Sequence, residues 1–390
     1  MIIIRLMVIL LLVSMLPAAK ASAAPPDKGV GLHLTKINAF RTGMPFADIF
    51  KYALIWITQR AGVSGNTKEK LPLDADGWIK SLEPGQRAKA LMLWVKKEIQ
   101  PTGIFEMTYT GNGRMTFGDN VKIVNKSKGR MTLEISQGVG AILAIEETDP
   151  KDPIRNIKIW LPGTPENGDK KNEFNPAYMK LTKDFRVFRY MDWLRANKDR
   201  VVSWEDRVKP TNATQASDKG VALEHIVGFS NRMKAAPWIN IHHRASDRYV
   251  RKFAEFFRDN LNPDLKIYIE YSNEVWNSRF PQKKYAAKMA KKRGYKSSDE
   301  FYFRRSIEIF KIFEDVFGDD KRLVRVIASQ FWNLNRIKQL LKYKKSGDKF
   351  DALADPVMTE QRRTQLRDAV FALDDLANVE ELMRLTVADR

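Results

Sequence analysis

From Phe174 onward, helical periodicity and short apolar strands alternate along the chain. The predicted helices cover residues 178–183, 223–233, 249–260 and 299–317, and the predicted strands that follow them cover 186–191, 237–242, 267–271 and 323–328. A further helical stretch leads into a short strand around Phe350–Leu353. Repeated helix-strand units of this length favour a parallel sheet, either open or closed into a barrel.

The segment 101–165 has a different character. Its short β-like runs are separated by turn signals such as Gly111-Asn112-Gly113, which predicts a small antiparallel β unit. Ahead of it, 24–100 would supply a first barrel strand near Gly29–Leu34 and a helical connection, with a helix over Phe46–Thr58. We therefore expect an α/β chain with a TIM-barrel-like segment over 166–354, an inserted β unit, and a helical tail over 355–390.

The N-terminal 1–23 is typical of a secretory signal peptide. One positive charge at Arg5 precedes an apolar run from Leu6 to about Ala19, and Ala21-Ser22-Ala23 fits a cleavage site. The run is short for a permanent span, although an uncleaved anchor is the alternative, and no later segment is apolar enough to cross a bilayer. We expect a secreted or periplasmic protein, and because the chain has no cysteine it must rely on a hydrophobic core.

A formal charge of +20 is spread along the chain. Its densest basic run lies on a predicted helix between Lys283 and Arg293. Such a surface would attract anionic polymers of the cell envelope, or it is simply a solvated helix face. No nucleic-acid-binding motif accompanies it, so we expect no specific nucleic acid partner.

Polar and aromatic residues follow the predicted strands at their carboxyl ends, where functional groups gather in such folds. The residues in these positions are Arg189, Asp192, Trp193, His242, His243, Asp247, Asn273, Glu274, Trp276, Ser329, Gln330 and Trp332. Tryptophan can stack on pyranose faces, while the polar groups can hydrogen-bond hydroxyls. The pattern predicts a carbohydrate site, with poly- or oligosaccharide as the partner.

Three segments carry a resemblance to a known group. Phe188-Arg189-Tyr190-Met191-Asp192-Trp193, Pro237-Trp238-Ile239-Asn240-Ile241-His242 and Glu270-Tyr271-Ser272-Asn273-Glu274-Val275-Trp276-Asn277 resemble exported bacterial glycoside hydrolases or cellulose-binding-domain proteins. These are related to the retaining (β/α)8 cellulase-like clan, whose fourth strand ends in Asn-Glu.

The resemblance implies roles for individual residues. Glu274 would be the general acid/base of a retaining mechanism, and Asn273 would bind the hydroxyl next to the reacting carbon. Arg189 would help to position the nucleophilic carboxylate, unless it serves only a salt bridge. His242 or His243 would line the sugar subsite, unless both are packing residues.

Other carboxylates fit the chemistry less well. Glu270 lies four residues before Glu274, which along a strand puts the two about 13 Å apart. A catalytic pair needs about 5 Å or at most about 9 Å. Asp192 could approach Glu274 from a neighbouring strand end, or could cap the next segment. With only four histidines, two of them adjacent, we expect no metal or cofactor.

The clan takes its nucleophile from a seventh strand, and only six barrel strands can be counted here. After about Ala354 the resemblance stops, which predicts a truncated gene product with an unrelated tail. No nucleophile can be assigned from the sequence, so whether the chain is an enzyme stays open. The hypotheses are a glycoside hydrolase, a carbohydrate-binding protein without hydrolysis, and a basic envelope protein that holds anionic polymer.

Overall fold

The computed structural model describes residues 30–60, 62–63, 65–164, 173–198, 200–318, 321–330, 333 and 335–336. These residues form two compact units. Unit 1 takes its described residues from Val30 to Leu34, from Asp184–Asp206 and from Ser230 onward, and unit 2 consists of Thr35–Lys183 and Arg207–Phe229. The predicted signal peptide, sixth strand and tail lie outside the described residues.

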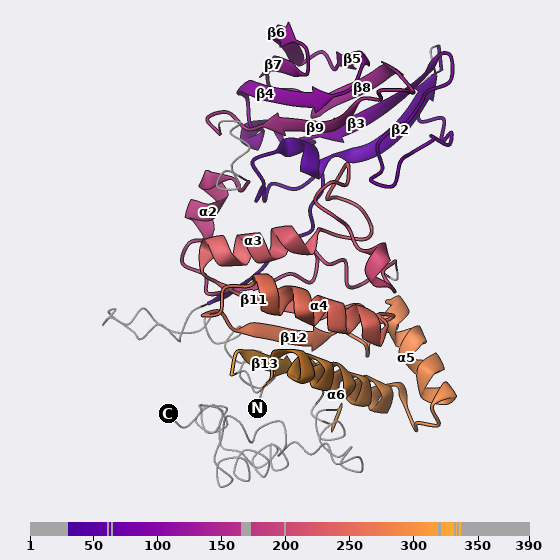
Figure 1. The fold of residues 1–390 in the computed structure, drawn as a ribbon, viewed down its shortest axis with the longest axis vertical. Helices are drawn as coiled ribbons and strands as arrows, with labels where there is room; N and C mark the ends of the chain where they lie inside the picture. The colour runs from indigo at the N-terminus through magenta and orange to yellow at the C-terminus, as the bar shows by residue number, and fades with distance from the viewer. Residues whose placement is uncertain are drawn as a thin grey trace, which may run out of the picture. The chain divides into compact units, whose positions relative to one another are not determined.

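Unit 1 contains a five-stranded parallel sheet whose strands follow one another in chain order. They are β1 (Gly31–His33), β10 (Val187–Arg189), β11 (Ala236–Ile241), β12 (Ile267–Tyr271) and β13 (Leu323–Val326). Figure 1 labels the last three of these strands. The predicted parallel sheet is thus confirmed in this mixed α/β chain.

One face of this sheet packs against helices. Ile239, Ile241, Ile267 and Ile269 are fully buried, and Tyr271 on the same face stacks against Tyr302 of α6 with 5.9 Å between ring centroids. These residues recur at every second position, as the strand period requires.

The helices of the described chain are α2 (Pro176–Thr182), α3 (Leu223–Met233), α4 (Asp247–Asn260), α5 (Pro281–Lys292) and α6 (Ser298–Phe317), with short 3-10 turns η1 (Ile49–Tyr52), η2 (Lys97–Ile99) and η4 (Trp204–Asp206).

The alternate positions of the strands carry polar and aromatic side chains. Arg189 pairs in register with Trp238, and Asn240 pairs with Glu270. Because 238 and 240 share one side of β11, all four side chains point to the face opposite the isoleucines. This face leads directly into the polar groups at the carboxyl ends of the strands.

Unit 2 consists of two four-stranded antiparallel sheets. Their strand orders are β2-β3-β8-β5 and β6-β7-β4-β9. The strands are β2 (Leu54–Arg60), β3 (Gln86–Met92), β4 (Gly103–Thr110), β5 (Gly113–Phe117), β6 (Val121–Ser127), β7 (Arg130–Ile135), β8 (Ala141–Thr148) and β9 (Arg155–Trp160). Phe105, Met107, Leu133, Leu143 and Ile145 are completely or almost completely buried and form its core.

The short β-like runs predicted within 101–165 correspond to β4–β9. Between β4 and β5, the predicted turn at Gly111 has a φ of 88°. A Cβ there would lie 2.1 Å from the carbonyl oxygen of Pro153, so only glycine fits this turn.

The predicted helix over Phe46–Thr58 is wrong. Asp48 caps only the short turn η1 by accepting a hydrogen bond from the amide of Phe50 at 3.0 Å. The chain becomes extended at Ala53, and β2 follows. The apolar, partly β-branched run Leu54-Ile55-Trp56-Ile57 instead pairs with β3. The β-rich part of the chain therefore begins well before residue 101.

The first and last segments of the long stretch between β1 and β10 meet within unit 2. Phe46 and Phe174 form an isolated antiparallel bridge, and the amide of Asn175 donates to the carbonyl of Pro45 at 2.8 Å. The register of β1 with β10 begins at Gly31 and Val187.

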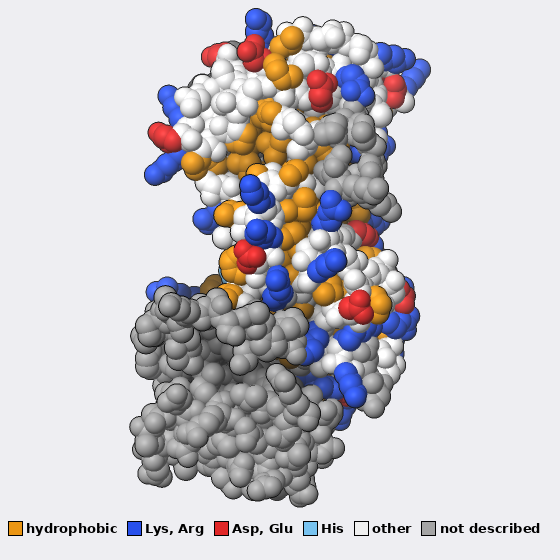
Figure 2. Space-filling view, turned by 90° about the vertical axis from the view of Figure 1, so that its left-hand side faces the viewer, with side chains coloured by type: hydrophobic (Ala, Val, Ile, Leu, Met, Phe, Trp, Pro, Cys, Tyr) orange, Lys and Arg blue, Asp and Glu red, His pale blue; other side chains and the backbone are white. Residues whose placement is uncertain are grey.

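The surface carries basic side chains in many places, and Figure 2 shows lysines and arginines spread over the visible face. The predicted basic run is helical and corresponds to α5, on which Lys284, Lys288, Lys291 and Lys292 are exposed. None of the helices in the described part of the chain combines the length and apolar character of a membrane span.

Candidate functional site

The polar groups at the carboxyl ends of the unit 1 strands are organised around Arg189, the last residue of β10. Its Nη2 donates to Oε2 of Glu270 at 2.9 Å and to Oδ1 of Asn273 at 3.0 Å. Its guanidinium carbon lies 4.9 Å from the centre of the Trp238 ring. One cation thus joins groups from three neighbouring strands, an arrangement that fixes their relative positions.

Glu270 is 1% exposed. The indole Nε1 of Trp238 donates to its Oε2 at 3.0 Å, so this oxygen accepts from both Trp238 and Arg189. A buried carboxylate needs such partners to remain charged. Glu270 therefore has a structural role in the sheet. Its contact with Arg189 supports the alternative in which Arg189 serves a salt bridge.

The backbone after β12 turns sharply. Ser272 has a φ of 58° and Glu274 a φ of 37°, so both non-glycine residues that flank Asn273 adopt left-handed conformations. Such conformations cost about 1–3 kcal/mol each and cluster at functional sites. The turn carries the chain out of β12 at the carboxyl end of the strand.

Asn273 is 6% exposed and has a partner for each half of its amide. Its Oδ1 accepts from Arg189, and its Nδ2 donates to Oδ1 of Asn197 at 3.0 Å. Gln282, at the start of α5, donates to the same Asn197 oxygen at 2.7 Å and to the Asn273 carbonyl at 2.6 Å. The asparagine is thus held rigidly by the loop after β10 and by α5.

Glu274 is half-buried. Its Oε2 accepts from Nδ2 of Asn277 at 2.8 Å, and its carbonyl accepts from the amide of the same residue at 2.9 Å. A half-buried carboxyl with one amide donor keeps room for a further partner, as a proton-transferring group requires.

Trp276 is also half-buried. The guanidinium carbon of Arg336 lies 4.8 Å from its ring centre, and Arg336 is itself fixed by Asp299, with its Nη2 2.9 Å from Oδ1. One face of the indole is therefore occupied by this cation.

Three predicted sugar-binding residues are buried in the structure. Trp193 is 1% exposed and packs edge-on against Tyr190. His242 and His243 are each 3% exposed and lie edge-on to Tyr249 and Tyr285, respectively. Burial lowers the pKa of His242 to about 3, and the neighbouring His243 contributes to the shift. For the two histidines, these contacts match the packing alternative.

Asp192 is paired with a residue that the sequence pattern did not single out. Its Oδ2 lies 3.5 Å from Nε2 of His33, the last residue of β1, and both side chains are about one third exposed. Gln330 is exposed after β13. The sequence pattern missed His33, Asn197 and Gln282. Strand β1 has only three residues, too few to mark His33 as a strand end, and Asn197 and Gln282 do not lie at the end of a strand.

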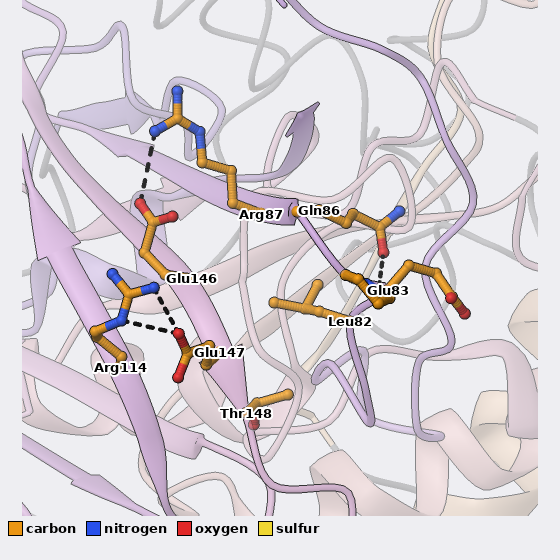
Figure 3. Close-up of a pocket in the computed structure, with 10 residues that line it drawn as sticks. Leu82, Glu83, Gln86, Arg87, Arg114, Glu146, Glu147 and Thr148 are labelled. Atoms are coloured by element: carbon orange, nitrogen blue, oxygen red, sulfur yellow. Dashed lines mark hydrogen bonds and ion pairs between the residues drawn. The ribbon is translucent and has the colours of Figure 1, made fainter. Parts of the chain in front are cut away.

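Unit 2 has a polar hollow of about 420 Å³, shown in Figure 3. Four of its charged side chains form two ion pairs, Arg114 with Glu147 at 2.6 Å and Arg87 with Glu146 at 3.6 Å. Glu83 is the fifth charged residue of the lining.

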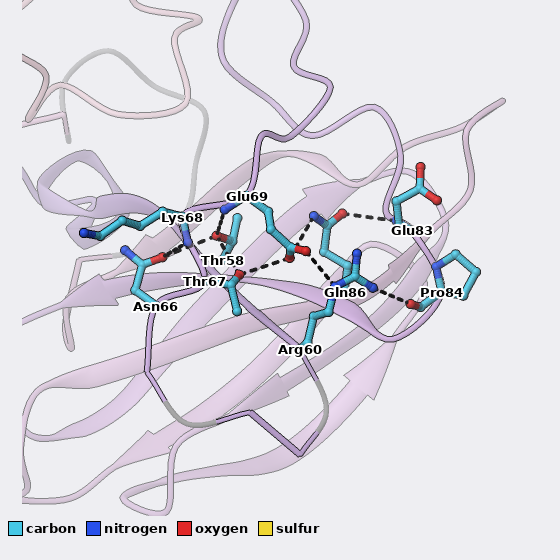
Figure 4. Close-up of polar contacts among 9 residues, drawn as sticks. All are labelled: Thr58, Arg60, Asn66, Thr67, Lys68, Glu69, Glu83, Pro84 and Gln86. Carbon is cyan, nitrogen blue, oxygen red and sulfur yellow. Dashed lines mark hydrogen bonds and ion pairs between the residues drawn. The ribbon is translucent and has the colours of Figure 1, made fainter.

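Beside this hollow, a hydrogen-bond network ties the segment after β2 to the start of β3 (Figure 4). Glu69 accepts from Nε of Arg60 at 2.6 Å and from Oγ1 of Thr67 at 3.0 Å. The bond from Arg60 lowers the pKa of Glu69 below its ordinary value. The network fastens a loop and has the features of a structural contact.

Within the part of the chain that the structure describes, no group of three or more histidines and carboxylates could hold a metal ion. Comparisons of the chain with protein-family models, with curated proteins and with solved structures found no match.

Proposed function

We propose that the carboxyl edge of the unit 1 sheet binds carbohydrate and hydrolyses glycosidic bonds, with Glu274 as the general acid/base. The observation that carries this proposal is the fixed Asn273-Glu274 pair. Asn273 is held by Arg189 and Asn197, and left-handed residues direct the pair out of β12. Preorganised polar groups of this kind can orient a sugar and a proton donor.

We also propose that the sheet is part of a (β/α) barrel. Five parallel strands in chain order are the arrangement that successive right-handed crossovers of a barrel would produce. In barrel enzymes the reacting groups lie at the carboxyl ends of the strands. Asn273, Glu274 and Asp192 all occupy such positions.

The proposed mechanism is double displacement. Glu274 protonates the leaving oxygen, a second carboxylate attacks the anomeric carbon, and Glu274 then activates the water that releases the sugar. Glu270 does not suit the second role, because it is buried and bound by Arg189 and Trp238. Asp192, which is one third exposed, is the described carboxylate that we put forward for it.

Hydrolysis by the purified protein on aryl glycosides and polysaccharides tests the proposal. Glu274→Gln should lower kcat by about 10²–10⁴-fold, because the amide cannot transfer the proton. Glu255→Gln, on α4, is the matched control and should leave kcat unchanged. Equal rates with wild-type protein, Glu274→Gln and buffer alone would refute catalysis.

Asp192→Asn tests the second carboxylate separately. If Asp192 is the nucleophile, this variant should lose activity as fully as Glu274→Gln, whereas a loss of less than about tenfold would refute that role. Product stereochemistry followed by NMR at early times should show retention of the anomeric configuration.

The second candidate function is retention of anionic polymer by the basic face of α5. It is favoured by the exposure of Lys284, Lys288, Lys291 and Lys292 along one helix. Binding to heparin would then weaken steeply with added NaCl, would be unaffected by Glu274→Gln, and would fall when these lysines are replaced by glutamine. Salt-independent retention would count against it.

A further inference from the structure

A chain of three titratable side chains lies inside unit 2, apart from the proposed carbohydrate site. Nζ of Lys51, in η1, is 3.2 Å from Nε2 of His225, in α3. Nδ1 of the same imidazole pairs with Oε1 of Glu173. The His225 side chain is 4% exposed and that of Glu173 is 25% exposed, so the imidazole is the buried middle member of the chain.

These contacts assign the roles of the two imidazole nitrogens. The carboxylate of Glu173 can only accept a hydrogen bond, so Nδ1 of His225 carries the hydrogen. Nε2 is then an acceptor and faces the amine of Lys51. Burial, followed by the charge of Lys51, lowers the pKa of His225, which favours the neutral imidazole that this assignment needs.

The amine also lies close to an aromatic ring. Nζ of Lys51 lies 5.6 Å from the centre of the Phe46 ring, and the same ring packs edge-on against His225 at 5.1 Å. Burial lowers the pKa of Lys51; Asp48 and Glu173 oppose the shift, whereas Lys158 on β9 adds to it. The charge of Glu224, next to His225 on α3, raises the pKa of His225 and so opposes the effect of burial.

The backbone that carries Lys51 is fixed. Its carbonyl accepts from the amide of Gln215 at 3.0 Å and from Oγ1 of Thr214 at 3.3 Å. The residue is nevertheless half-buried rather than fully enclosed. An amine held against a neutral base, beside an aromatic ring and with part of its side chain exposed, has the arrangement of an activated nucleophile.

We propose that Lys51 is a nucleophilic amine that condenses reversibly with small aldehydes, with His225 as its proton acceptor and Glu173 as the group that orients His225. The neutral amine nitrogen forms a bond to the carbonyl carbon while the C=O π electrons move to oxygen, and Nε2 of His225 takes one amine proton and returns it to that oxygen, which gives the carbinolamine. The second amine proton follows the same route to the hydroxyl group, which leaves as water as the C=N bond of the imine forms. The proposal is independent of the function proposed for unit 1.

Trapping with benzaldehyde and sodium cyanoborohydride at pH 7 tests the proposal on the full chain, because the hydride converts the imine into a stable secondary amine. Peptide mass spectrometry then gives the labelling rate of each lysine. Lys89 on β3 is the matched reference, because burial also lowers its pKa but the structure gives it no histidine partner among the described residues. Lys51 should react about tenfold faster than Lys89. Equal rates would overturn the proposal.

Two variants test the relay. His225→Gln and Glu173→Gln should each slow labelling of Lys51 by about tenfold while leaving Lys89 unchanged, since general base assistance is lost or misdirected. Circular dichroism checks that each variant is folded. Unchanged labelling of Lys51 in a folded variant would remove His225 or Glu173 from the mechanism. Should one variant fail to fold, the other variant and the Lys51-to-Lys89 ratio of the wild type still decide.

Discussion

Arg189 and Glu270 form an ion pair of 2.9 Å in which the glutamate side chain is 1% exposed and the arginine side chain 21% exposed. The pair connects β10 to β12 across β11. Because Arg189 also donates to Oδ1 of Asn273, one cation both neutralises a buried charge and orients a residue of the proposed site.

Replacing Arg189 by methionine should destabilise unit 1 by about 3 kcal/mol, because Glu270 would remain buried with the Trp238 indole as its other described partner. Arg186→Met, at an exposed position just before β10, is the control and should change stability by no more than about 0.5 kcal/mol. Urea denaturation followed by tryptophan fluorescence measures both.

The double variant Arg189→Met/Glu270→Gln should recover part of that loss, since no uncompensated charge is left in the sheet. Equal stabilities of Arg189→Met and Arg186→Met would show that the ion pair contributes nothing.

Position 272 should prefer glycine to alanine. Ser272 is buried, has a φ of 58°, and its Oγ has no hydrogen-bond partner among the described residues. Ser272→Gly and Ser272→Ala both remove the hydroxyl, so they differ mainly in backbone freedom. The glycine variant should be more stable by about 0.5–1 kcal/mol in thermal or urea unfolding. A more stable alanine variant would contradict the left-handed turn.

His242 should make unit 1 sensitive to acid. Its pKa is about 3 in the folded protein and about 6.5 in an unfolded chain. The unfolded state therefore binds the proton first, and stability is lost as the pH falls below about 6.5, with a slope of about 1.4 kcal/mol per pH unit. The free energy of unfolding of His242→Gln, measured from pH 7.5 to 4.5, should lack this component. Parallel curves for the two proteins would disprove the shift.

Asp48 should be replaceable by asparagine but not by alanine. Its Oδ1 accepts from the amides of Phe50 and Ile159 at 3.0 and 2.9 Å, and burial raises its pKa despite these bonds and Lys51. Ionisation in the folded state therefore costs stability as the pH rises above about 3.8.

At pH 7, Asp48→Asn should match or exceed wild-type stability, because a neutral Oδ1 can accept both bonds. Asp48→Ala should lose about 1–3 kcal/mol. Calorimetry at pH 7 and pH 4 checks both, and the advantage of asparagine should shrink at pH 4. An asparagine variant as unstable as the alanine variant would show that the negative charge is needed.

The strand and helix patterns of unit 1 were predictable because periodicity and burial coincide there. Alternation over Ile267, Ile269 and Tyr271 predicted β12, and the predicted helices 249–260 and 299–317 correspond closely to α4 and α6. The prediction of a helix over 46–58 was wrong because a short apolar run is compatible with one face of a helix as well as with a strand. Pairing with β3, which decides the outcome, depends on residues more than twenty positions away.

The candidate site was predictable only in part. The position of Asn273 and Glu274 follows from where a strand ends, and that needs little tertiary information. The depth of Trp193 and His242 depends on how the loops after the strands pack, as when the amide of Ser246 donates to the carbonyl of Val202 at 3.0 Å. No local pattern encodes such a contact between distant segments, so residue types suited to sugars were predicted at positions where the structure uses them for packing.

The bridge between Phe46 and Phe174 and the neighbouring hydrogen bond from Asn175 to Pro45 hold the two ends of the segment between β1 and β10 together. Strand β1 is three residues long and must find β10 across the whole of Thr35–Lys183. Were that stretch a flexible coil, closing it would carry an entropy cost that grows with its length. A folded unit 2 removes this cost by fixing its own entry and exit. Folding of unit 2 would thus favour the pairing of β1 with β10.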